Sequence, residues 1–145
     1  MSVETVFAIC NYGVLPAWLL IAFAPSWAWT NRIVHAIWIP GLLASAYIWA
    51  FANNGAAPEG AGFGSLAGVM LLLSQPHAAL AGWIHYLAFD LFVGAWEARD
   101  AQRLGISPIL VAPCLLLTLM AGPTGLLAYG LLRWTVAKRV TLQES

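Results

Sequence analysis

Long apolar stretches alternate with short polar connections along this chain. Residues 5–31, 33–58, 60–89 and 104–132 contain no Asp, Glu, Lys or Arg. Each stretch is longer than the ~20 residues that an α-helix needs to cross a bilayer. A soluble helix bundle needs polar outer faces, which these stretches cannot supply. The pattern therefore predicts an all-α integral membrane protein.

The polar connections divide the chain into helices that belong to one transmembrane helical domain, residues 1–145. Four spans are expected, at about residues 5–24, 33–51, 77–98 and 109–136. A loop rich in Gly and Ala occupies residues 52–65. Residues 66–74, with Ser65 as a helix N-cap, would rise only ~13 Å, which predicts a short interfacial or re-entrant helix. The expected fold is a small bundle of four transmembrane helices plus this short helix.

The last span has two interpretations, because Pro113 and the sequence "AGPTG" at residues 121–125 interrupt it. It is either one kinked helix or two half-helices that form a hairpin in the membrane. We favour one span, since residues 109–136 are enough for a tilted, kinked helix. Charge does not decide, because four spans place three basic residues on each side. A hairpin would instead bring five basic residues to one side, namely Arg99, Arg103, Arg133, Lys138 and Arg139.

Composition supports a membrane environment and little else. The chain is 61% hydrophobic and 8% charged, with a formal net charge of zero. This balance predicts the lipid bilayer as a partner and gives no support for nucleic acid. Cys10 and Cys114 form no CxxC pair and are interpreted as buried small apolar residues. The opening "MSVETVFAIC" lacks the basic region of a signal peptide, so a retained first span is expected.

Asp90 is the polar residue that the apolar pattern explains least. It lies a few residues past the middle of its span, where an ionised Asp costs about 2.5–3.5 kcal/mol on insertion scales. At 100° per residue, Trp83, Asp90 and Glu97 share one helix face, whereas His85 is ~140° from Asp90 and cannot touch it on the same helix. Asp90 must therefore be neutral, paired or facing a wet cavity. The candidate partners are Asn11, Arg32, His35, Asn53, His85 and Arg99.

The acidic residues near this site allow a chemical and a structural interpretation. Asp90 is either a proton donor, acceptor or metal ligand, or a hydrogen-bonding centre that fixes helix packing. Glu97 and Asp100 are expected at a solvated helix end, where Asp100 can pair with Arg103. No HExxH or paired ExxH motif appears, so no metal site is predicted and any cofactor is unknown. The "GAGFG" of residues 60–64 lacks the context of a phosphate-binding loop.

Two long segments carry a family resemblance. They are "WIHYLAFDLFVGAWEARDAQRLGI" at residues 83–106 and "PCLLLTLMAGPTGLLAYGLLR" at residues 113–133. Together with "NYGVLPAWLLIAFAP" at 11–25 and "FGSLAGVMLL" at 63–72, they resemble the abscisic-acid-deficient-type, or neoxanthin-synthase-like, membrane proteins. The family has plastid members in plants and short relatives in bacteria. The resemblance covers nearly the whole chain. The short length of the chain favours a bacterial inner-membrane protein.

The resemblance implies carotenoid or isoprenoid metabolism. Plant members are associated with the isomerisation of violaxanthin to neoxanthin, in which an epoxide opens and an allene forms. Such a reaction needs an acid near the epoxide oxygen and a base near a vinylic proton. From the residues, we assign Asp90 as the candidate acid, His85 as the candidate base and Glu97 as a proton relay to solvent.

Three functions remain open at this point. The leading hypothesis is an isomerase that acts on a lipophilic polyene within the bilayer. The first alternative is a non-catalytic pigment- or lipid-binding subunit of a larger membrane complex or homo-oligomer. The second is a small transporter, although no inverted repeat is visible in the sequence.

Overall fold

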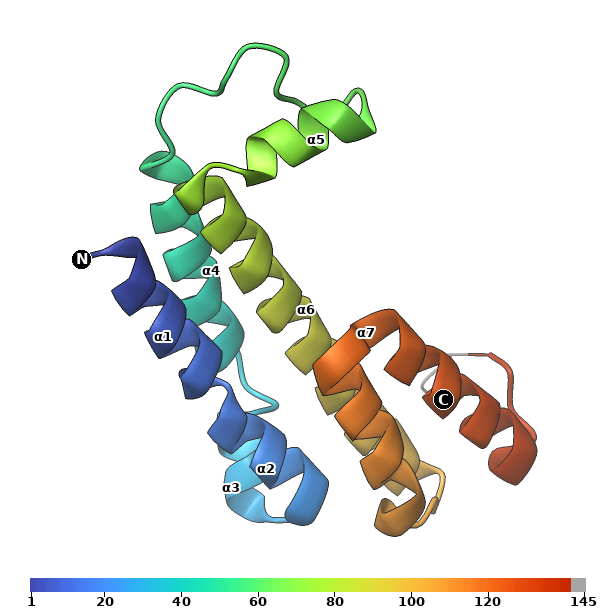
Figure 1. Cartoon of the computed structure of the whole chain (residues 1–145). Helices are drawn as coiled ribbons and strands as arrows, with labels where there is room; N and C mark the ends of the chain where they lie inside the picture. Colours follow the sequence, from blue (N-terminus) through green and yellow to red (C-terminus); the bar gives the residue numbers. More distant parts are fainter. Residues whose placement is uncertain (142–145) are drawn as a thin grey trace. The chain divides into compact units, whose positions relative to one another are not determined.

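The chain is helical wherever it has regular structure. The computed structural model describes residues 1–141, and no strand occurs among them. Figure 1 labels the helices in chain order. They are α1 (Val3–Gly13), α2 (Leu15–Phe23), α3 (Ala28–Ile33), α4 (Trp38–Ala52), α5 (Leu66–Leu73), α6 (Pro76–Arg103) and α7 (Pro108–Ala137).

Four helical stretches are long and apolar enough to span a membrane. Their bounds are Val3–Phe23, Ala28–Ala52, Pro76–Arg103 and Pro108–Ala137. Large apolar side chains on these stretches are exposed, as lipid contact requires; Phe23 is an example. The short α5 begins where predicted, because the Ser65 side chain accepts a hydrogen bond from the backbone N–H of Gly68 at 3.1 Å. The expected fold class, four apolar helices with one short extra helix, is confirmed.

The first two apolar stretches are each interrupted once. α2 starts with Pro16 in its first turn, a position where the missing N–H costs nothing. Residues 34–37 separate α3 from α4, and Pro40 lies in the first turn of α4. Proline thus begins a new helical segment in both places rather than ending the apolar stretch.

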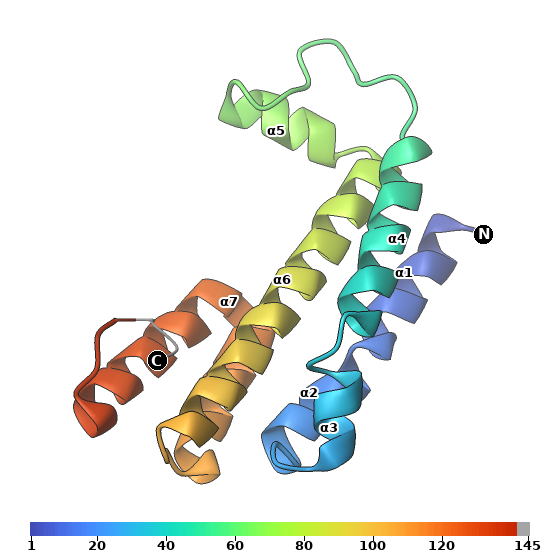
Figure 2. The ribbon, with the colours of Figure 1, turned by 180° about the vertical axis from the view of Figure 1, so that it is seen from behind.

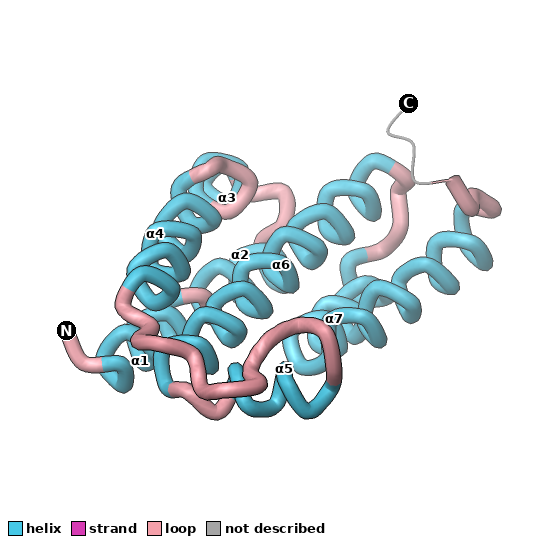
Figure 3. Tube along the Cα trace, turned by 90° about the horizontal axis from the view of Figure 1, so that it is seen from above, coloured by secondary structure: helices cyan, strands magenta, loops and turns pink. Residues whose placement is uncertain are grey.

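The structure divides into two compact parts, which are described separately. The first part contains Met1–Gly13 and Pro40–Ala88, so it holds α1, most of α4, α5 and the amino half of α6. Figure 3 shows the long loop between α4 and α5. Aromatic contacts are common here: the ring of Trp83 lies 5.4 Å from that of Tyr86 and 6.0 Å from that of Phe7.

The second part contains Val14–Ile39 and the chain from Phe89 onward, so it holds α2, α3, the carboxyl half of α6 and α7. α2 and α6 approach closely at Gly94. A Cβ built on Gly94 would lie 2.6 Å from the Trp18 ring, so glycine is needed for this packing. Cys114 is buried here and Cys10 is buried in the first part; both thiols are free, as the sequence predicts.

Helix α7 folds back on itself. Ala121 has non-helical dihedral angles (φ −158°, ψ 68°), which divide α7 into two arms. Figure 1 shows both arms, and Figure 2 shows the second arm from behind. A Cβ on Gly125 would collide with the backbone of Thr118, although a straight helix would separate these residues by almost two turns. Thr118 in the first arm contacts Glu97, yet Arg133 in the second arm contacts Asp100, one turn nearer the end of α6. The second arm therefore runs back toward the point where the first began.

This reversal bears on the two interpretations of residues 109–136. The segment meets the length and hydropathy expected of a span. Within it, however, the chain has the hairpin form that the sequence left as the alternative, and not a continuous tilted helix. Pro123 stabilises the turn because it cannot donate the hydrogen bond that would continue the helix across Ala121.

Candidate functional site

The carboxyl half of α6 presents three acidic side chains to the α7 hairpin. Glu97 is 0% exposed and Asp100 is 2% exposed, while Asp90 is half-buried. The prediction that Glu97 and Asp100 lie at a solvated helix end is wrong. Sequence reasoning placed them near the membrane edge, but the first arm of α7 covers Glu97 and the second arm covers Asp100.

Asp100 is the centre of an ionic cluster. One of its oxygens, Oδ2, accepts hydrogen bonds from the Tyr129 hydroxyl at 2.6 Å and from Arg133 Nε at 2.7 Å. Its other oxygen, Oδ1, pairs with Arg103, which confirms the predicted pairing within α6. With two cations and a hydroxyl around it, Asp100 is stable as a carboxylate and has a structural role.

Arg133 is 1% exposed, and each of its three side-chain nitrogen atoms has an acceptor. Besides its bonds to Asp100, Nη1 donates to the backbone carbonyls of Arg139 at 3.2 Å and Thr141 at 2.6 Å. The segment after α7 therefore closes over the guanidinium group. A buried guanidinium must be satisfied in this way, since an isolated buried charge is very costly.

Glu97 has a different environment, although it lies only one turn from Asp100. Thr118 Oγ1 lies 3.0 Å from both carboxyl oxygens of Glu97 and 3.0 Å from the carbonyl oxygen of Cys114. No ion pair to Glu97 occurs within residues 1–141. Two neighbouring carboxyl groups thus differ in kind, one held by cations and one held by a hydroxyl.

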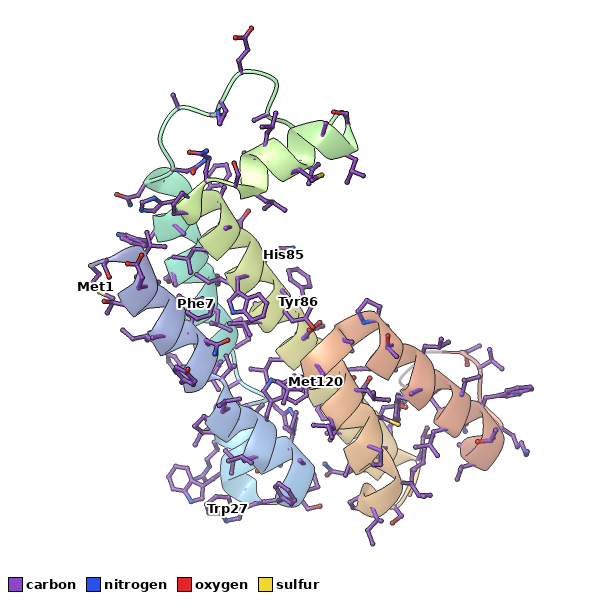
Figure 4. The ribbon with its side chains drawn as sticks, in the orientation of Figure 1. Met1, Phe7, Trp27, His85, Tyr86 and Met120 are labelled. Atoms are coloured by element: carbon purple, nitrogen blue, oxygen red, sulfur yellow. The ribbon has the colours of Figure 1, made fainter. Side chains whose placement is uncertain are left out.

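Asp90 lies against the turn of the hairpin. Its carboxyl group packs on Gly122, where a Cβ would collide with Oδ1. Met120, labelled in Figure 4, marks the end of the first arm beside this turn. Gly122 therefore lets the backbone of α7 approach a carboxyl group that is half-buried among apolar helices.

The residues predicted to partner Asp90 have the following contacts. Arg99 Nη1 donates to His35 Nδ1 at 2.9 Å, which fixes the His35 proton on Nε2; that atom is buried without a hydrogen-bond partner in the described chain. Asn11 accepts a hydrogen bond from Trp83 Nε1 at 3.1 Å.

Two further candidate partners have local contacts. Asn53 Nδ2 donates to the carbonyl of Trp49, one turn earlier on α4. The guanidinium group of Arg32 lies 5.4 Å from the centre of the Trp29 ring. These geometries are typical of residues that stabilise helix ends and interfaces.

His85 belongs to the first part of the structure and is exposed. Its ring centroid lies 6.4 Å from that of Tyr47 (Figure 4 labels His85 and Tyr86). Asp90 and Glu97 belong to the second part, on the face that meets α7. Of the three predicted catalytic residues, the structure therefore brings two to one helix face, and the role of His85 stays a prediction.

Sequence reasoning missed the α7 side of the site. It interpreted Arg133 as a basic residue at the end of the last span and Cys114 as a buried small apolar residue. It did not consider Thr118 or Tyr129. Their spacing carried a signal: five small or polar residues of this apolar segment recur at intervals of three and four, and these five are buried. They are Thr118, Gly122, Gly125, Tyr129 and Arg133.

An open apolar groove of about 690 Å³ lies between α2 and the first arm of α7. Trp18, Phe23, Pro113 and Leu119 are among the residues that line it. Trp18 also packs on Gly94, one turn after Asp90, so its indole ring contacts both the groove and α6. The volume is within the usual range for small-molecule sites.

Metal coordination has no geometric support in the described residues. No group of three His, Cys, Asp or Glu side chains between residues 1 and 141 is arranged to hold a metal ion. The polar side chains of the site instead bond to one another. Their arrangement can hold or transfer a proton, and it can orient an oxygen-containing ligand.

Comparison with known proteins gives one match. The sequence model of a family described as ABA4-like, ABA DEFICIENT 4-like, matches residues 5–129. The match includes all of α6 and ends at Tyr129 in the second arm of α7. No curated protein and no solved structure matches the chain.

Proposed function

The chain belongs to the ABA DEFICIENT 4-like family, and from this premise we propose that it is an isomerase of carotenoid or related isoprenoid metabolism. The family suggests a role in carotenoid or abscisic-acid-related metabolism. An enzyme of this kind, resident in a bacterial inner membrane, would act on a lipophilic polyene that reaches it through the bilayer. Its four apolar helices suit that environment.

The observation that carries the proposal is the half-buried carboxyl group of Asp90 on Gly122. A carboxyl group in apolar surroundings is favoured in its neutral form, and a neutral acid can donate a proton to an epoxide oxygen. Asp90 is the acid in this proposal, and Glu97 is a second carboxyl group two turns along the same face. His85 keeps the role of base that its chemistry suggests.

The groove beside α2 supports binding of the apolar part of such a substrate. Its walls are aromatic and aliphatic, and Trp18 joins the groove to the helix turn that follows Asp90. A polyene chain has no polar groups to satisfy, so apolar walls suffice along most of its length. The polar end of the substrate would then reach the acidic face of α6.

The same groove favours a second candidate function, a non-catalytic pigment- or lipid-binding subunit of a membrane complex or homo-oligomer. A binding subunit needs the groove but does not need an acid. The two functions therefore differ in whether Asp90 is required for chemical conversion.

The experiment expresses the chain in a carotenoid-producing host and follows the pigment profile by chromatography. The isomerase proposal expects a new isomer of a supplied epoxy-xanthophyll, which is lost in Asp90→Asn and His85→Ala. Asn53→Ala is the matched control, because Asn53 is exposed and its side chain bonds to its own helix. Pigment that co-purifies with the protein unchanged would support the binding subunit. An unchanged pigment profile across several carotenoids, with no bound pigment, would contradict both.

A further inference from the structure

The hydroxyl group of Thr118 lies among more acceptors than it can serve. Oγ1 is 3.0 Å from Glu97 Oε1, 3.0 Å from Glu97 Oε2 and 3.0 Å from the carbonyl oxygen of Cys114. Carbonyl and carboxylate oxygens only accept hydrogen bonds. A threonine hydroxyl group has one hydrogen to donate and two lone pairs that accept.

An ionised Glu97 does not fit this geometry. All three neighbouring oxygens would then be acceptors, and the single hydrogen of Thr118 could satisfy only part of them. A carboxylate offers about four acceptor positions, so most would be empty in a side chain that is 0% exposed. Burying a charge without a cation or a full set of donors is strongly unfavourable.

A protonated Glu97 gives its own O–H, the Thr118 hydroxyl and the Cys114 carbonyl one hydrogen-bond partner each, and it removes the buried charge. Its O–H donates to a lone pair of Thr118 Oγ1, and the Thr118 hydroxyl donates to the carbonyl of Cys114. We propose that Glu97, Thr118 and the Cys114 carbonyl form a proton-holding site, in which Glu97 is a neutral acid and Thr118 is the residue that positions its proton. Two consecutive hydrogen bonds thus connect the Glu97 carboxyl group on α6 to the Cys114 backbone carbonyl on α7.

The charged neighbours of Glu97 do not supply a counter-ion. On α6, Asp90 and Asp100 flank it with acidic groups, and Arg103 pairs with Asp100. On α7, the Arg133 guanidinium is committed to Asp100 and to two backbone carbonyls.

The remaining titratable groups around Glu97 lead to the same conclusion. Tyr129 donates its hydrogen to Asp100, and the Cys114 thiol donates to the carbonyl of Leu110. α2, the other helix packed on α7, carries no titratable side chain. Protonation is therefore the way in which Glu97 is accommodated.

Gly125 makes the site possible. A Cβ at Gly125 would collide with the backbone nitrogen and the hydroxyl oxygen of Thr118. Glycine at this position lets the second arm close on the first while Oγ1 stays directed at Glu97. The hairpin can therefore close without displacing the proton-holding site.

A neutral Glu97 would add a second acid to the helix face of the proposed isomerase. Its protonation does not depend on whether the chain is an isomerase. If the chain is an isomerase, Glu97 is a second neutral carboxyl group on the same helix face as the candidate acid Asp90. If it is a binding subunit, the same neutral carboxyl group remains. The closing experiment therefore measures the proton directly and does not use catalytic activity.

The experiment records infrared spectra of the protein in lipid nanodiscs at neutral pH, in H₂O and in D₂O. A neutral carboxylic acid has a carbonyl band separate from that of a carboxylate, and the band shifts when its proton is exchanged for deuterium. We expect a component of this band in the native protein that is lost in Glu97→Gln and kept in Asp90→Asn. Asp90→Asn is the matched control, because it removes the other carboxyl group of this face that could be neutral.

Thr118 is tested by a conservative pair of variants. Thr118→Ser keeps the hydroxyl group and is expected to keep the band at its native position, whereas Thr118→Val is expected to shift or remove it. A band that Thr118→Val leaves unchanged would overturn the positioning role. A band that persists in Glu97→Gln and disappears in Asp90→Asn would overturn the assignment to Glu97.

A second measurement uses only the native protein, so its result does not depend on whether the variants fold. Solid-state NMR of the native protein, labelled with ¹³C at the glutamate carboxyl carbons, distinguishes neutral from ionised groups by chemical shift. The expected spectrum contains one neutral glutamate at neutral pH. Four ionised glutamates would contradict the proposal.

Discussion

The two halves of α6 belong to one continuous helix but are stabilised differently. The amino half, within the first part of the structure, makes aromatic contacts through Trp83 and His85, and its bond from Trp83 to Asn11 is exposed. The carboxyl half, within the second part, buries Glu97 and Asp100 under α7. The first half thus presents aromatic side chains, and the second presents buried acidic side chains.

The difference shows what allows acidic groups to be buried in so apolar a chain. The carboxyl half is covered by a hairpin whose glycines let the backbone approach and whose second arm delivers Tyr129 and Arg133 to Asp100. The amino half receives aromatic rings instead. The buried ion pair and the buried carboxyl hydrogen bonds of α6 therefore lie against the α7 hairpin. Variants in the two halves of α6 and in α7 should accordingly differ in their effect on stability.

The largest effect is expected from Arg133→Met. It leaves Asp100 buried with only the partly exposed Arg103 as a cation, and breaking a buried ion pair in this way costs about 3–5 kcal/mol. Thermal unfolding in detergent measures the change. Arg103→Gln is the comparison and should cost less than Arg133→Met, because that side chain is 30% exposed and Arg133 still pairs with Asp100. Equal losses in the two variants would show that Arg133 is not buried against Asp100.

Gly125→Ala should have the next largest effect. Its new methyl group meets the backbone of Thr118, which cannot rotate away, and such overpacking costs about 1–3 kcal/mol. Gly130→Ala, on the same arm, is the matched control: nothing lies within 4 Å of its Cβ, and alanine should stabilise the helix by up to about 1 kcal/mol. If both alanines are tolerated alike, the two arms of α7 do not touch.

Trp83→Phe should have a small effect, because it removes an exposed hydrogen bond and keeps an aromatic ring. A loss of about 0.5–1.5 kcal/mol is expected in the same unfolding assay. A loss as large as that of Arg133→Met would mean that the amino half of α6 also depends on polar contacts.

The smallest change in stability is expected from His85→Ala. His85 is exposed, and substitutions at such positions usually change stability by less than about 0.5 kcal/mol. Conversion of the xanthophyll should nevertheless be lost if His85 is the base. An active His85→Ala variant with native stability would remove His85 from the mechanism.

The sequence predicted the helices better than the site. Charge-free stretches and the Ser65 cap were local signals, so the fold class and the start of α5 followed from them. Asp90 could be identified as costly from its place in a span. The environments of Glu97 and Asp100 could not. That of Glu97 depends on how the first arm of α7 packs on α6, and that of Asp100 depends on α7 folding back, where "AGPTG" allowed either a kink or a hairpin.

The burial of Asp100 against Arg133 requires the reversal of α7, and a distance between the two arms of α7 tests that reversal most directly. Spin labels at Leu110→Cys and Thr135→Cys, with Cys10 and Cys114 replaced by alanine, can be measured by pulsed electron resonance in nanodiscs. A straight helix would separate the two Cα atoms by about 38 Å, from 25 residues at about 1.5 Å each. The fold described here predicts a much shorter distance. A distance near that of the straight helix would contradict it, because Arg133 could not then reach Asp100.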